Sequence, residues 1–440
     1  MRSSSTRSHA LSGTVSAPGD KSISHRAMIF GAMATGTTHV TGLLEGADIL
    51  STASVMQALG AKIMKTGVGA YQVEGCGEGG LQTPDVNLDC GNAGTGVRLI
   101  MGACAGYKLR ATYTGDASLS SRPMNRILDP LREMGAIATA QEGGRLPVTL
   151  ESDGDLKPLT YTPPVASAQI KSAVLLAAVN TKGVTTITEP IPTRDHTENM
   201  LRAFGATIEV TQKNGADVIR LDGPVRLKGT KVNVPGDPSS AAFIIVAALI
   251  TPGSDVLVEN VMMNPTRTGL FDCLTEMGGH VRPTYFRKSG GEVIADIHVK
   301  SSKLHGITVP PARAASMIDE YPILAVAASV AKGTTIMDDI AELRVKESDR
   351  IKATVALLAN NGVDVTELEN GIKVVGGEVS GGGLVTTHHD HRIAMSALIL
   401  GLVADAPVTI DDGAMIATSF PTFFDVMTGL GANISIDKTA

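Results

Sequence analysis

The stretch P-G-D-K-S-I-S-H-R at residues 18–26 decides the fold of this 440-residue chain. It predicts the end of a strand, a tight turn at Pro-Gly, and a helix whose first turn is capped by Asp20 or Ser22. The free N–H groups and the dipole of such a helix start favour anions. Lys21 and Arg26 add two positive charges, so the stretch is a candidate anion site.

A second copy of this stretch, P-G-D-P-S-S-A-A-F, begins at Pro235, about half the chain length further on. Pro238 stands where the first copy has Lys21, and Phe243 stands where it has Arg26. The chain is therefore predicted to consist of two related halves. Only the turn of the first half carries charged side chains that could take part in binding or catalysis.

The composition excludes several classes of protein. The hydrophobic content of 43% supports large cores, and the net charge of −6 argues against a general nucleic-acid binder. No apolar run reaches membrane-spanning length. The four cysteines lack metal-binding spacing and indicate reduced thiols in a cytosolic protein. The first ten residues have no targeting pattern and are expected to form a frayed terminus.

A sixfold repeat extends through the chain. In each copy a helical pattern ends at a glycine and a strand pattern follows, which predicts a left-handed helix cap. These glycines are Gly60, Gly135, Gly205, Gly278, Gly362 and Gly431. Five copies continue through a turn into a second strand, most clearly at the Asn-Gly pairs 214–215 and 370–371.

The sixth copy ends without a hairpin partner, and the strand pattern at 11–17 has no preceding helix. We expect this N-terminal strand to complete the sixth unit. The predicted domains are then 20–235, and 1–19 together with 236–440. The chain would cross between them near 18–21 and 234–237, and these two crossings would act as a hinge.

Charged or small polar residues stand at several predicted helix starts in the first half. A Gly-rich loop at 89–98 contains Arg98, Arg122 precedes a proline, Ser167 begins a long apolar helix, and Arg194 precedes another helix. Alone, each has an ordinary explanation: a tight turn, a surface arginine, helix capping or a solvated helix start.

The second half has three further charged segments. Asp319 and Glu320 precede an apolar helix, where acids also favour the helix dipole. At helical spacing within the run 342–350, Lys346 and Arg350 share a face, which is also typical of a surface salt-bridge face. The histidines in 388–391 lack a second ligand cluster, so we do not expect a metal there. Together, cations in both halves indicate closure on a ligand with several anionic groups.

At these motifs the chain closely resembles the 5-enolpyruvylshikimate-3-phosphate synthase family. The motifs are P-G-D-K-S-I-S-H-R, G-N-A-G-T, R-P-M, S-A-Q, R-V-K-E-S-D-R and D-H-R-I-A-M, in this order along essentially the whole chain. The resemblance implies an α/β fold of two domains, each with three βαβαββ units. It also implies transfer of the carboxyvinyl group of phosphoenolpyruvate to the 5-hydroxyl of shikimate 3-phosphate, with phosphate released. No metal or organic cofactor, no nucleic-acid or membrane partner, and a cytoplasmic monomer are expected.

The resemblance also implies roles for individual residues. Shikimate 3-phosphate would contact Lys21, Ser22, Arg26, Ser167, Ala168, Gln169, Arg194, Asp319 and Lys346. Phosphoenolpyruvate would contact Lys21, Gly94, Thr95, Arg122, Gln169, Glu347, Arg350 and Arg392. Catalysis would fall to Asp319 at the hydroxyl, Glu347 at the methylene carbon, Lys346 as charge partner, and Lys21 between the substrates.

Some positions depart from the common family pattern. Leu99 replaces a proline, Glu342 replaces an asparagine, and the segment before Phe420-Pro421 lacks a lysine that would contact phosphoenolpyruvate. These departures are similar to a divergent bacterial class that includes herbicide-tolerant members, which carry alanine at the position of Gly94.

Two other functions fit parts of the pattern. One is the related enolpyruvyl transferase acting on UDP-N-acetylglucosamine, whose loop cysteine is replaced here by Ala117. The other is a phosphosugar-binding protein without catalysis, which would not need Asp319 and Glu347 together.

Overall fold

The computed structural model describes residues 1–289 and 291–437. The chain divides into two compact units. The first-half unit comprises Gly19–Val234 with Ser289–Gly291, and the second-half unit comprises Met1–Pro18, Pro235–Lys288 and Glu292–Ala440. At the two crossings, the backbone N–H of Asp237 donates to the carbonyl of Pro18 at 2.8 Å. The two Pro-Gly-Asp turns are therefore hydrogen-bonded to each other.

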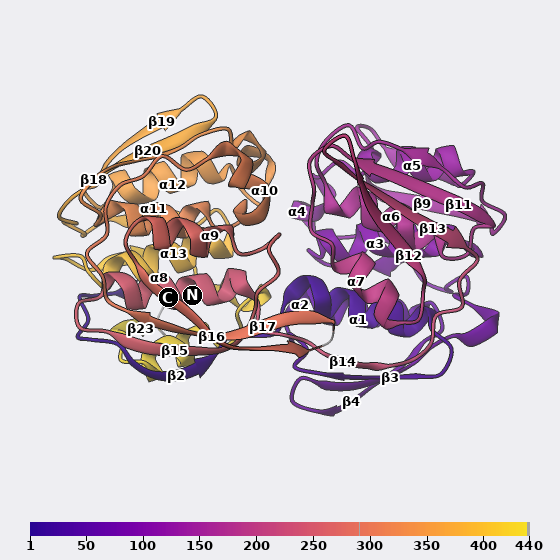
Figure 1. The fold of residues 1–440 in the computed structure, drawn as a ribbon, viewed down its shortest axis with the longest axis horizontal. Helices are drawn as coiled ribbons and strands as arrows, with labels where there is room; N and C mark the ends of the chain where they lie inside the picture. The colour runs from indigo at the N-terminus through magenta and orange to yellow at the C-terminus, as the bar shows by residue number, and fades with distance from the viewer. Residues whose placement is uncertain (290, 438–440) are drawn as a thin grey trace. The chain divides into compact units, whose positions relative to one another are not determined.

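The first-half unit, coloured indigo to magenta in Figure 1, contains three four-stranded sheets. In order across each sheet, their strands are β14 (Lys231–Asn233), β3 (Thr37–Thr41), β5 (Ala70–Glu74) and β4 (Lys62–Gly67); β6 (Leu88–Asp89), β7 (Lys108–Thr114), β9 (Arg145–Asp153) and β8 (Ile137–Gln141); and β10 (Thr160–Tyr161), β11 (Gly183–Glu189), β13 (Ala216–Gly223) and β12 (Ile208–Lys213).

The second-half unit repeats this order in three further sheets. They are β16 (His280–Ser289), β17 (Glu292–Lys300), β15 (Asp255–Met262) and β2 (Ser12–Ser16); β18 (Gly333–Met337), β20 (Gly371–Gly376) and β19 (Asp364–Leu368); and β21 (Leu384–Val385), β22 (Val408–Ile410), β1 (Ser3–Ser5) and β23 (Ile434–Ile436). In both units a short edge strand runs parallel to its neighbour, and a hairpin or its equivalent completes the sheet antiparallel.

Each repeat contributes two helices. The first of each pair, here called the inner helices, are α1 (Lys21–Met33), α3 (Gly94–Ala105) and α6 (Ala168–Ala178) in one unit, and α8 (Pro238–Ile250), α11 (Tyr321–Ser329) and α13 (His391–Gly401) in the other. The second of each pair are α2 (Ala47–Ala58), α5 (Asn125–Met134), α7 (His196–Ala203), α9 (Gly269–Glu276), α12 (Arg350–Ala359) and α14 (Phe423–Gly429). Short helical turns are α4 (Ala117–Ser120), α10 (Ala314–Met317), η1 (Gly77–Gly79), η2 (Pro311–Arg313), η3 (Ala341–Val345) and η4 (Ala414–Thr418).

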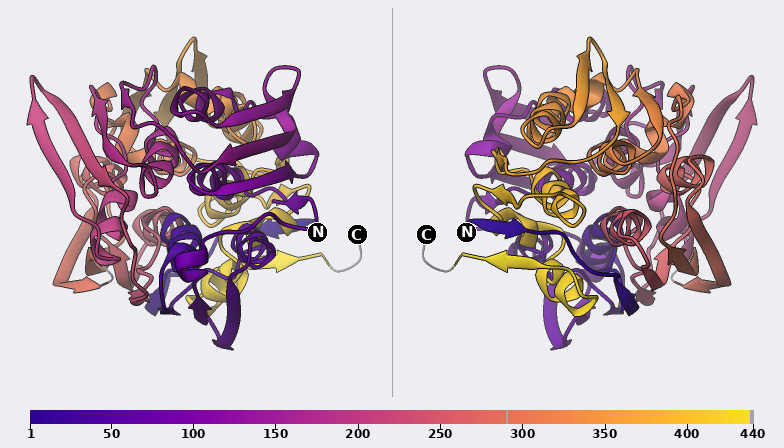
Figure 2. Two further views of the ribbon diagram at one scale, coloured as in Figure 1. Left: turned by 90° about the vertical axis from the view of Figure 1, so that its right-hand side faces the viewer. Right: turned by 90° about the vertical axis from the view of Figure 1, so that its left-hand side faces the viewer.

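The inner helices form the core of each unit. In the second-half unit α8, α11 and α13 contact one another, and every residue of α8 and α11 is buried. In the first-half unit α3 contacts both α1 and α6. Figures 1 and 2 show the inner helices of each unit packed together, with the strands outside them. Because these apolar helices are buried on all sides, their sequences do not show the one-sided hydrophobic pattern of a surface helix.

The six repeat glycines confirm the predicted helix ends. All six have positive φ, between 80° at Gly362 and 116° at Gly135. A side chain disfavours this left-handed conformation, so glycine ends the helix and redirects the chain into the next strand. The fold class, six α/β repeats with three in each unit, agrees with the sequence.

The prediction for the N-terminal strands was wrong. The strand within 11–17 is β2, and it pairs in parallel with β15 of the fourth sheet. The strand that completes the sixth sheet is β1, which lies between β22 and β23. The first ten residues therefore include the centre of a sheet and are not a frayed terminus. Three serines carry no apolar alternation, so the residue pattern does not predict this strand.

Candidate functional site

The exposed positions of the inner helices coincide with the predicted site. Most residues of these helices are buried, and the partly exposed ones lie in the first two positions. They are Lys21, Ser22, Thr95, Ala168, Gln169 and Arg392. Solvent therefore reaches these helices only at their first turns, where the free backbone N–H groups can bind an anion.

The predicted turn and helix at 18–26 are confirmed. Asp20 is the N-cap of α1, and its carboxylate accepts a hydrogen bond from the Ile23 amide at 2.7 Å. The Lys21 ammonium lies 2.5 Å from the carboxylate of Asp48, which is buried in the first turn of α2. This ion pair holds the ammonium at the helix start.

Arg26 connects three helices of the first-half unit. It is buried, and its guanidinium donates to the hydroxyls of Thr197 on α7 and Ser172 on α6, both at 2.8 Å. It also donates to the Ser22 carbonyl at 3.0 Å. These hydrogen bonds position two helix starts relative to α7, which follows Arg194. They are the start of α1 at Ser22 and the start of α6 at Ser167 and Ala168.

Gln169 connects α6 with α3. Its amide donates to the Thr95 hydroxyl at 3.1 Å and its carbonyl accepts from Arg98 at 3.0 Å. Gly94 is the first residue of α3, and a Cβ built there would lie 3.0 Å from a guanidinium nitrogen of Arg122. The candidate residues of the Gly-rich loop, the R-P-M segment and the S-A-Q segment therefore meet in one cluster.

Arg350 lies at the centre of the cluster in the second-half unit. Its side chain is 1% exposed and donates to Asp319 at 3.1 Å, to Glu347 at 2.6 Å, and to Asp390 at 2.8 Å. Both predicted catalytic carboxylates therefore share one arginine. Burial alone would raise the pKa of Asp390, but Arg350 and His391 outweigh it and lower that pKa.

Lys346 and Arg392 complete this cluster. The Lys346 ammonium is 3.8 Å from Asp319 and 2.9 Å from Glu342. Arg392 donates to the Asp319 carbonyl at 3.2 Å and to Glu320 at 3.3 Å. The expected helical spacing of Lys346 and Arg350 was wrong, because η3 ends at Val345 and α12 begins at Arg350. The side chains meet through a loop instead.

Sequence reasoning missed several buried polar residues beside these clusters. Asp48, Asp390 and Lys171 were not singled out, although each contacts or lies beside a candidate residue. His25 was quoted only as part of a motif. The His25 side chain is fully buried, and its Nδ1 forms a hydrogen bond with the Thr52 hydroxyl at 2.8 Å. Burial lowers the pKa of His25 to about 3. A neutral histidine therefore lies one turn after Lys21.

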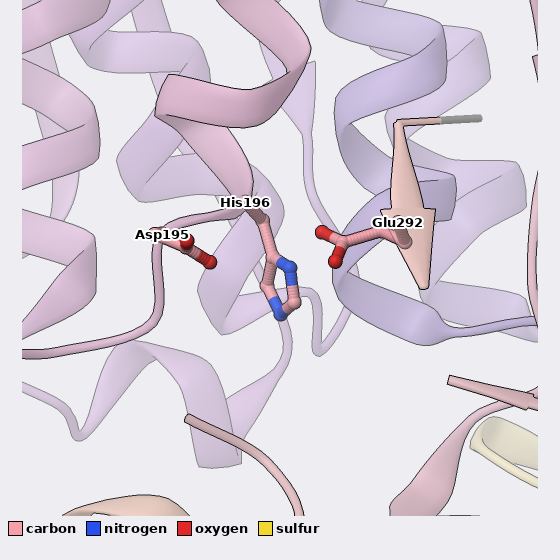
Figure 3. A group of neighbouring side chains, drawn as sticks. All are labelled: Asp195, His196 and Glu292. Atoms are coloured by element: carbon pink, nitrogen blue, oxygen red, sulfur yellow. The ribbon is translucent and has the colours of Figure 1, made fainter. Parts of the chain in front are cut away.

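Three residues whose side chains can ligate metals belong to different units. Figure 3 shows Asp195 and His196 at the beginning of α7 and Glu292 on β17. Asp195 and His196 belong to the first-half unit, whereas Glu292 belongs to the second-half unit. A metal site needs ligands held in fixed geometry, so we do not assign one to residues of different units.

Comparison with known proteins identifies the class. The family model of EPSP synthase (3-phosphoshikimate 1-carboxyvinyltransferase) matches residues 5–427. The 3-phosphoshikimate 1-carboxyvinyltransferase of Parvibaculum lavamentivorans is 59% identical, covering 97% of this chain and 95% of the relative. The enzyme of that name from Pseudomonas sp. strain PG2982 is 56% identical over 98% of this chain and 96% of its own.

Solved structures agree with this class. EPSP synthase from Acinetobacter baumannii has a TM-score of 0.89 and 45% identity, covering 99% of this chain and all of that one. The chain belongs to the EPSP synthase family. This match does not favour the UDP-N-acetylglucosamine transferase. Among the helices that the structure describes, none is long and apolar enough to cross a membrane.

Proposed function

We propose that the two clusters serve one reaction, with the roles that the family resemblance assigned residue by residue. The reaction is transfer of the carboxyvinyl group of phosphoenolpyruvate to the 5-hydroxyl of shikimate 3-phosphate, with release of phosphate. Each substrate carries a carboxylate and a phosphate. About four anionic groups must therefore be bound, and arginine forks and helix starts suit both kinds of group.

The first-half cluster would bind and orient the substrates. Arg26, Arg194, Ser22 and the start of α6 would hold shikimate 3-phosphate. Arg122 and the start of α3 at Gly94 would hold phosphoenolpyruvate, and Lys21 would lie between the two. This assignment is supported by the network at Arg26 and by the Gln169 contacts, which bring these groups onto adjoining helix starts.

The second-half cluster would carry the proton transfers. Addition requires a base at the 5-hydroxyl and an acid at the methylene carbon, and elimination reverses the carbon step. Asp319 would take the hydroxyl proton and Glu347 would serve the carbon, with Lys346 as the charge partner. Two carboxylates in different settings can divide acid and base work in this way.

The observation that carries the proposal is the sharing of Arg350 by Asp319 and Glu347. The carboxylate of phosphoenolpyruvate would compete for the same guanidinium. Its binding would weaken the ion pairs of the two acids and free them to accept protons. Arg350 would remain held by Asp390, whose contact at its Nε is 2.8 Å.

The test is a single assay of phosphate release with two acceptors and a control without acceptor. Phosphoenolpyruvate is incubated with shikimate 3-phosphate, with UDP-N-acetylglucosamine, and without acceptor. We expect phosphate release only with shikimate 3-phosphate, together with the enolpyruvyl ether detected by mass spectrometry. Release with the nucleotide sugar would support the related transferase, and binding without release would support the non-catalytic alternative.

We further propose that the crossings at 18–21 and 234–237 act as a hinge between domains 20–235 and 1–19 with 236–440. The support is the split of the candidate residues between the units. Small-angle scattering should show a smaller radius of gyration when shikimate 3-phosphate is bound. An unchanged radius, with binding confirmed by calorimetry, would contradict the hinge.

The proposed partners are the two small substrates alone, without a metal or organic cofactor, nucleic acid or membrane. The proposed form is a monomer. The proposed location is the cytoplasm, which the four free thiols support. Sedimentation at assay concentration would test the oligomeric state.

A further inference from the structure

A buried charged triad lies beside the first-half cluster. Lys171, on α6, has a side chain that is 2% exposed. Its ammonium lies 2.7 Å from Glu189 at the end of β11 and 2.7 Å from Glu198 on α7. It also donates to the Thr193 carbonyl at 3.4 Å. All four residues belong to the first-half unit, and both glutamates are as buried as the lysine.

This triad is not explained by stability. It buries two carboxylates against one ammonium, and buried ion pairs often stabilise no more than apolar residues of the same size. Within the part of the chain that the structure describes, Oε2 of Glu198 has no hydrogen-bond partner. Burial raises the pKa of Glu198, although Lys171 partly offsets this effect. A costly arrangement of this kind suggests a positional role.

Of the three segments joined by Lys171, two would contact shikimate 3-phosphate, and the third holds Arg26, which would also contact it. Its own helix begins with Ala168 and Gln169. The loop between Glu189 and α7 carries Arg194, and Glu189 also binds this loop through the Thr193 hydroxyl at 2.6 Å. The third segment, α7, carries Thr197, which contacts Arg26.

We propose that Lys171 is a positioning residue for the shikimate 3-phosphate site. Its ammonium sets the loop that carries Arg194 against the start of α6, so the two parts of the site keep one geometry. The residue acts through these segments and does not touch the substrate. Phosphoenolpyruvate would depend less on Lys171, because Gln169 is its one proposed contact on α6, whereas Gly94 and Arg122 belong to other segments. This inference rests on the proposed function.

The decisive variant is Lys171→Met, which keeps an unbranched side chain one atom shorter and removes its charge. We expect the dissociation constant and KM for shikimate 3-phosphate to rise roughly 10–100-fold, the usual effect of losing hydrogen bonds from a charged group such as Arg194. The KM for phosphoenolpyruvate should change less than about threefold, because Gln169 is its one proposed contact on α6 and a single neutral hydrogen bond contributes little. A purely structural role would lower the melting temperature without this split.

Three further variants separate position from stability and charge. Leu131→Ala, in the buried face of α5, serves as a destabilised control and should leave both KM values unchanged. In Lys171→Met with Glu198→Gln, one of the two carboxylates left without an ammonium is made neutral, so the melting temperature should recover in part while the affinity for shikimate 3-phosphate stays low. If Lys171→Met does not fold, Glu189→Gln replaces it and should raise the same KM several-fold.

The outcomes are decisive in each direction. Wild-type protein without turnover would overturn the proposed function itself. Normal wild-type turnover with unchanged affinity for shikimate 3-phosphate in folded Lys171→Met would overturn only the role of Lys171. Equal losses for both substrates, or full recovery of affinity in the double variant, would also overturn it.

Discussion

The two units begin with the same turn and build the same three sheets, yet they place their charged residues differently. Asp20 and Asp237 both cap an inner helix, at 2.7 Å and 2.8 Å. The helix after Asp20 continues with a paired lysine, whereas α8 continues with Pro238 and is buried throughout. The aspartate cap is therefore a feature of the fold that both units share.

The charges of α1 are not required by that fold. Phe243 occupies in α8 the position that Arg26 occupies in α1, and both side chains are buried. The second-half unit instead places its charges around the starts of α11, α12 and α13. This difference indicates that the repeat tolerates either choice. On the proposed roles, the charges of the first-half unit would serve binding, and those of the second-half unit would serve both proton transfer and binding of phosphoenolpyruvate.

The largest effect should follow from removing the base of the second-half unit. In Asp319→Ala, kcat should fall ~10²–10⁴-fold, the usual range for loss of a general base. Binding of shikimate 3-phosphate should change far less. Calorimetry and steady-state kinetics would separate the two effects.

The matched control is Asp405→Ala, which removes an exposed acid of the same unit that pairs with Arg7. Its turnover should equal that of the wild type. Near-normal kcat in Asp319→Ala would exclude this residue from the mechanism. It would also contradict the proposal that the second-half unit carries the proton transfers.

The next effect should come from Arg26→Lys in the first-half unit. Lysine cannot reach Thr197, Ser172 and the Ser22 carbonyl with one planar fork. Loss of hydrogen bonds from a charged group amounts to about 1.5–3 kcal/mol, so the KM for shikimate 3-phosphate should rise roughly 10–150-fold.

The corresponding change in the other copy is Phe243→Leu. It should leave both KM values unchanged and lower stability by less than about 1.5 kcal/mol, as conservative core replacements do. If both variants impaired binding alike, the two copies would not differ in role.

The repeat was predictable from the sequence because each copy contains a glycine at a helix end, where the backbone adopts a positive φ. Gly60, Gly135 and their counterparts end helices in a conformation that other residues disfavour, and their spacing shows the period. The motif residues were found because small and charged residues interrupt apolar helix starts, where burial is otherwise complete.

The remaining features depend on long-range packing. β1 has three serines and no alternation, and its place between β22 and β23 is decided by backbone pairing across more than 400 residues. Lys346 reaches Asp319 from a loop, which helical periodicity cannot predict. Lys171 stands within an apolar helix, and its partners Glu189 and Glu198 are separated from it in the sequence.

The two turns themselves differ in how tightly glycine is required. A Cβ at Gly19 would overlap the Gly42 carbonyl, whereas one at Gly236 would lie 3.0 Å from the Asn260 carbonyl. Gly19→Ala should therefore lower the free energy of unfolding by about 1–3 kcal/mol, and Gly236→Ala by less. Urea unfolding of both variants tests this order, and equal losses would show that the crossings are equally constrained.

The smallest effect concerns Gly94, at the start of α3 in the first-half unit. The family resemblance implies that glyphosate occupies the phosphoenolpyruvate site as a slightly longer anion. In Gly94→Ala the new methyl would meet guanidinium nitrogens of Arg122 and Arg98 at 3.0 Å and 3.4 Å. These are ends of flexible side chains, so we expect the lower end of the usual overpacking cost, about 1 kcal/mol or roughly fivefold in binding.

The displaced Arg122 guanidinium should affect the longer anion more than the substrate. We therefore expect glyphosate to inhibit the wild type, and Gly94→Ala to raise its inhibition constant more than the KM for phosphoenolpyruvate. Both constants are measured on both proteins, with Gly429→Ala as a control, since a Cβ there has no heavy atom of the described residues within 4 Å. Equal losses would mean that the methyl does not discriminate by length. A tolerant wild type would mean that Gly94 does not determine sensitivity, and the search would move to Leu99, which follows Arg98 on the same helix.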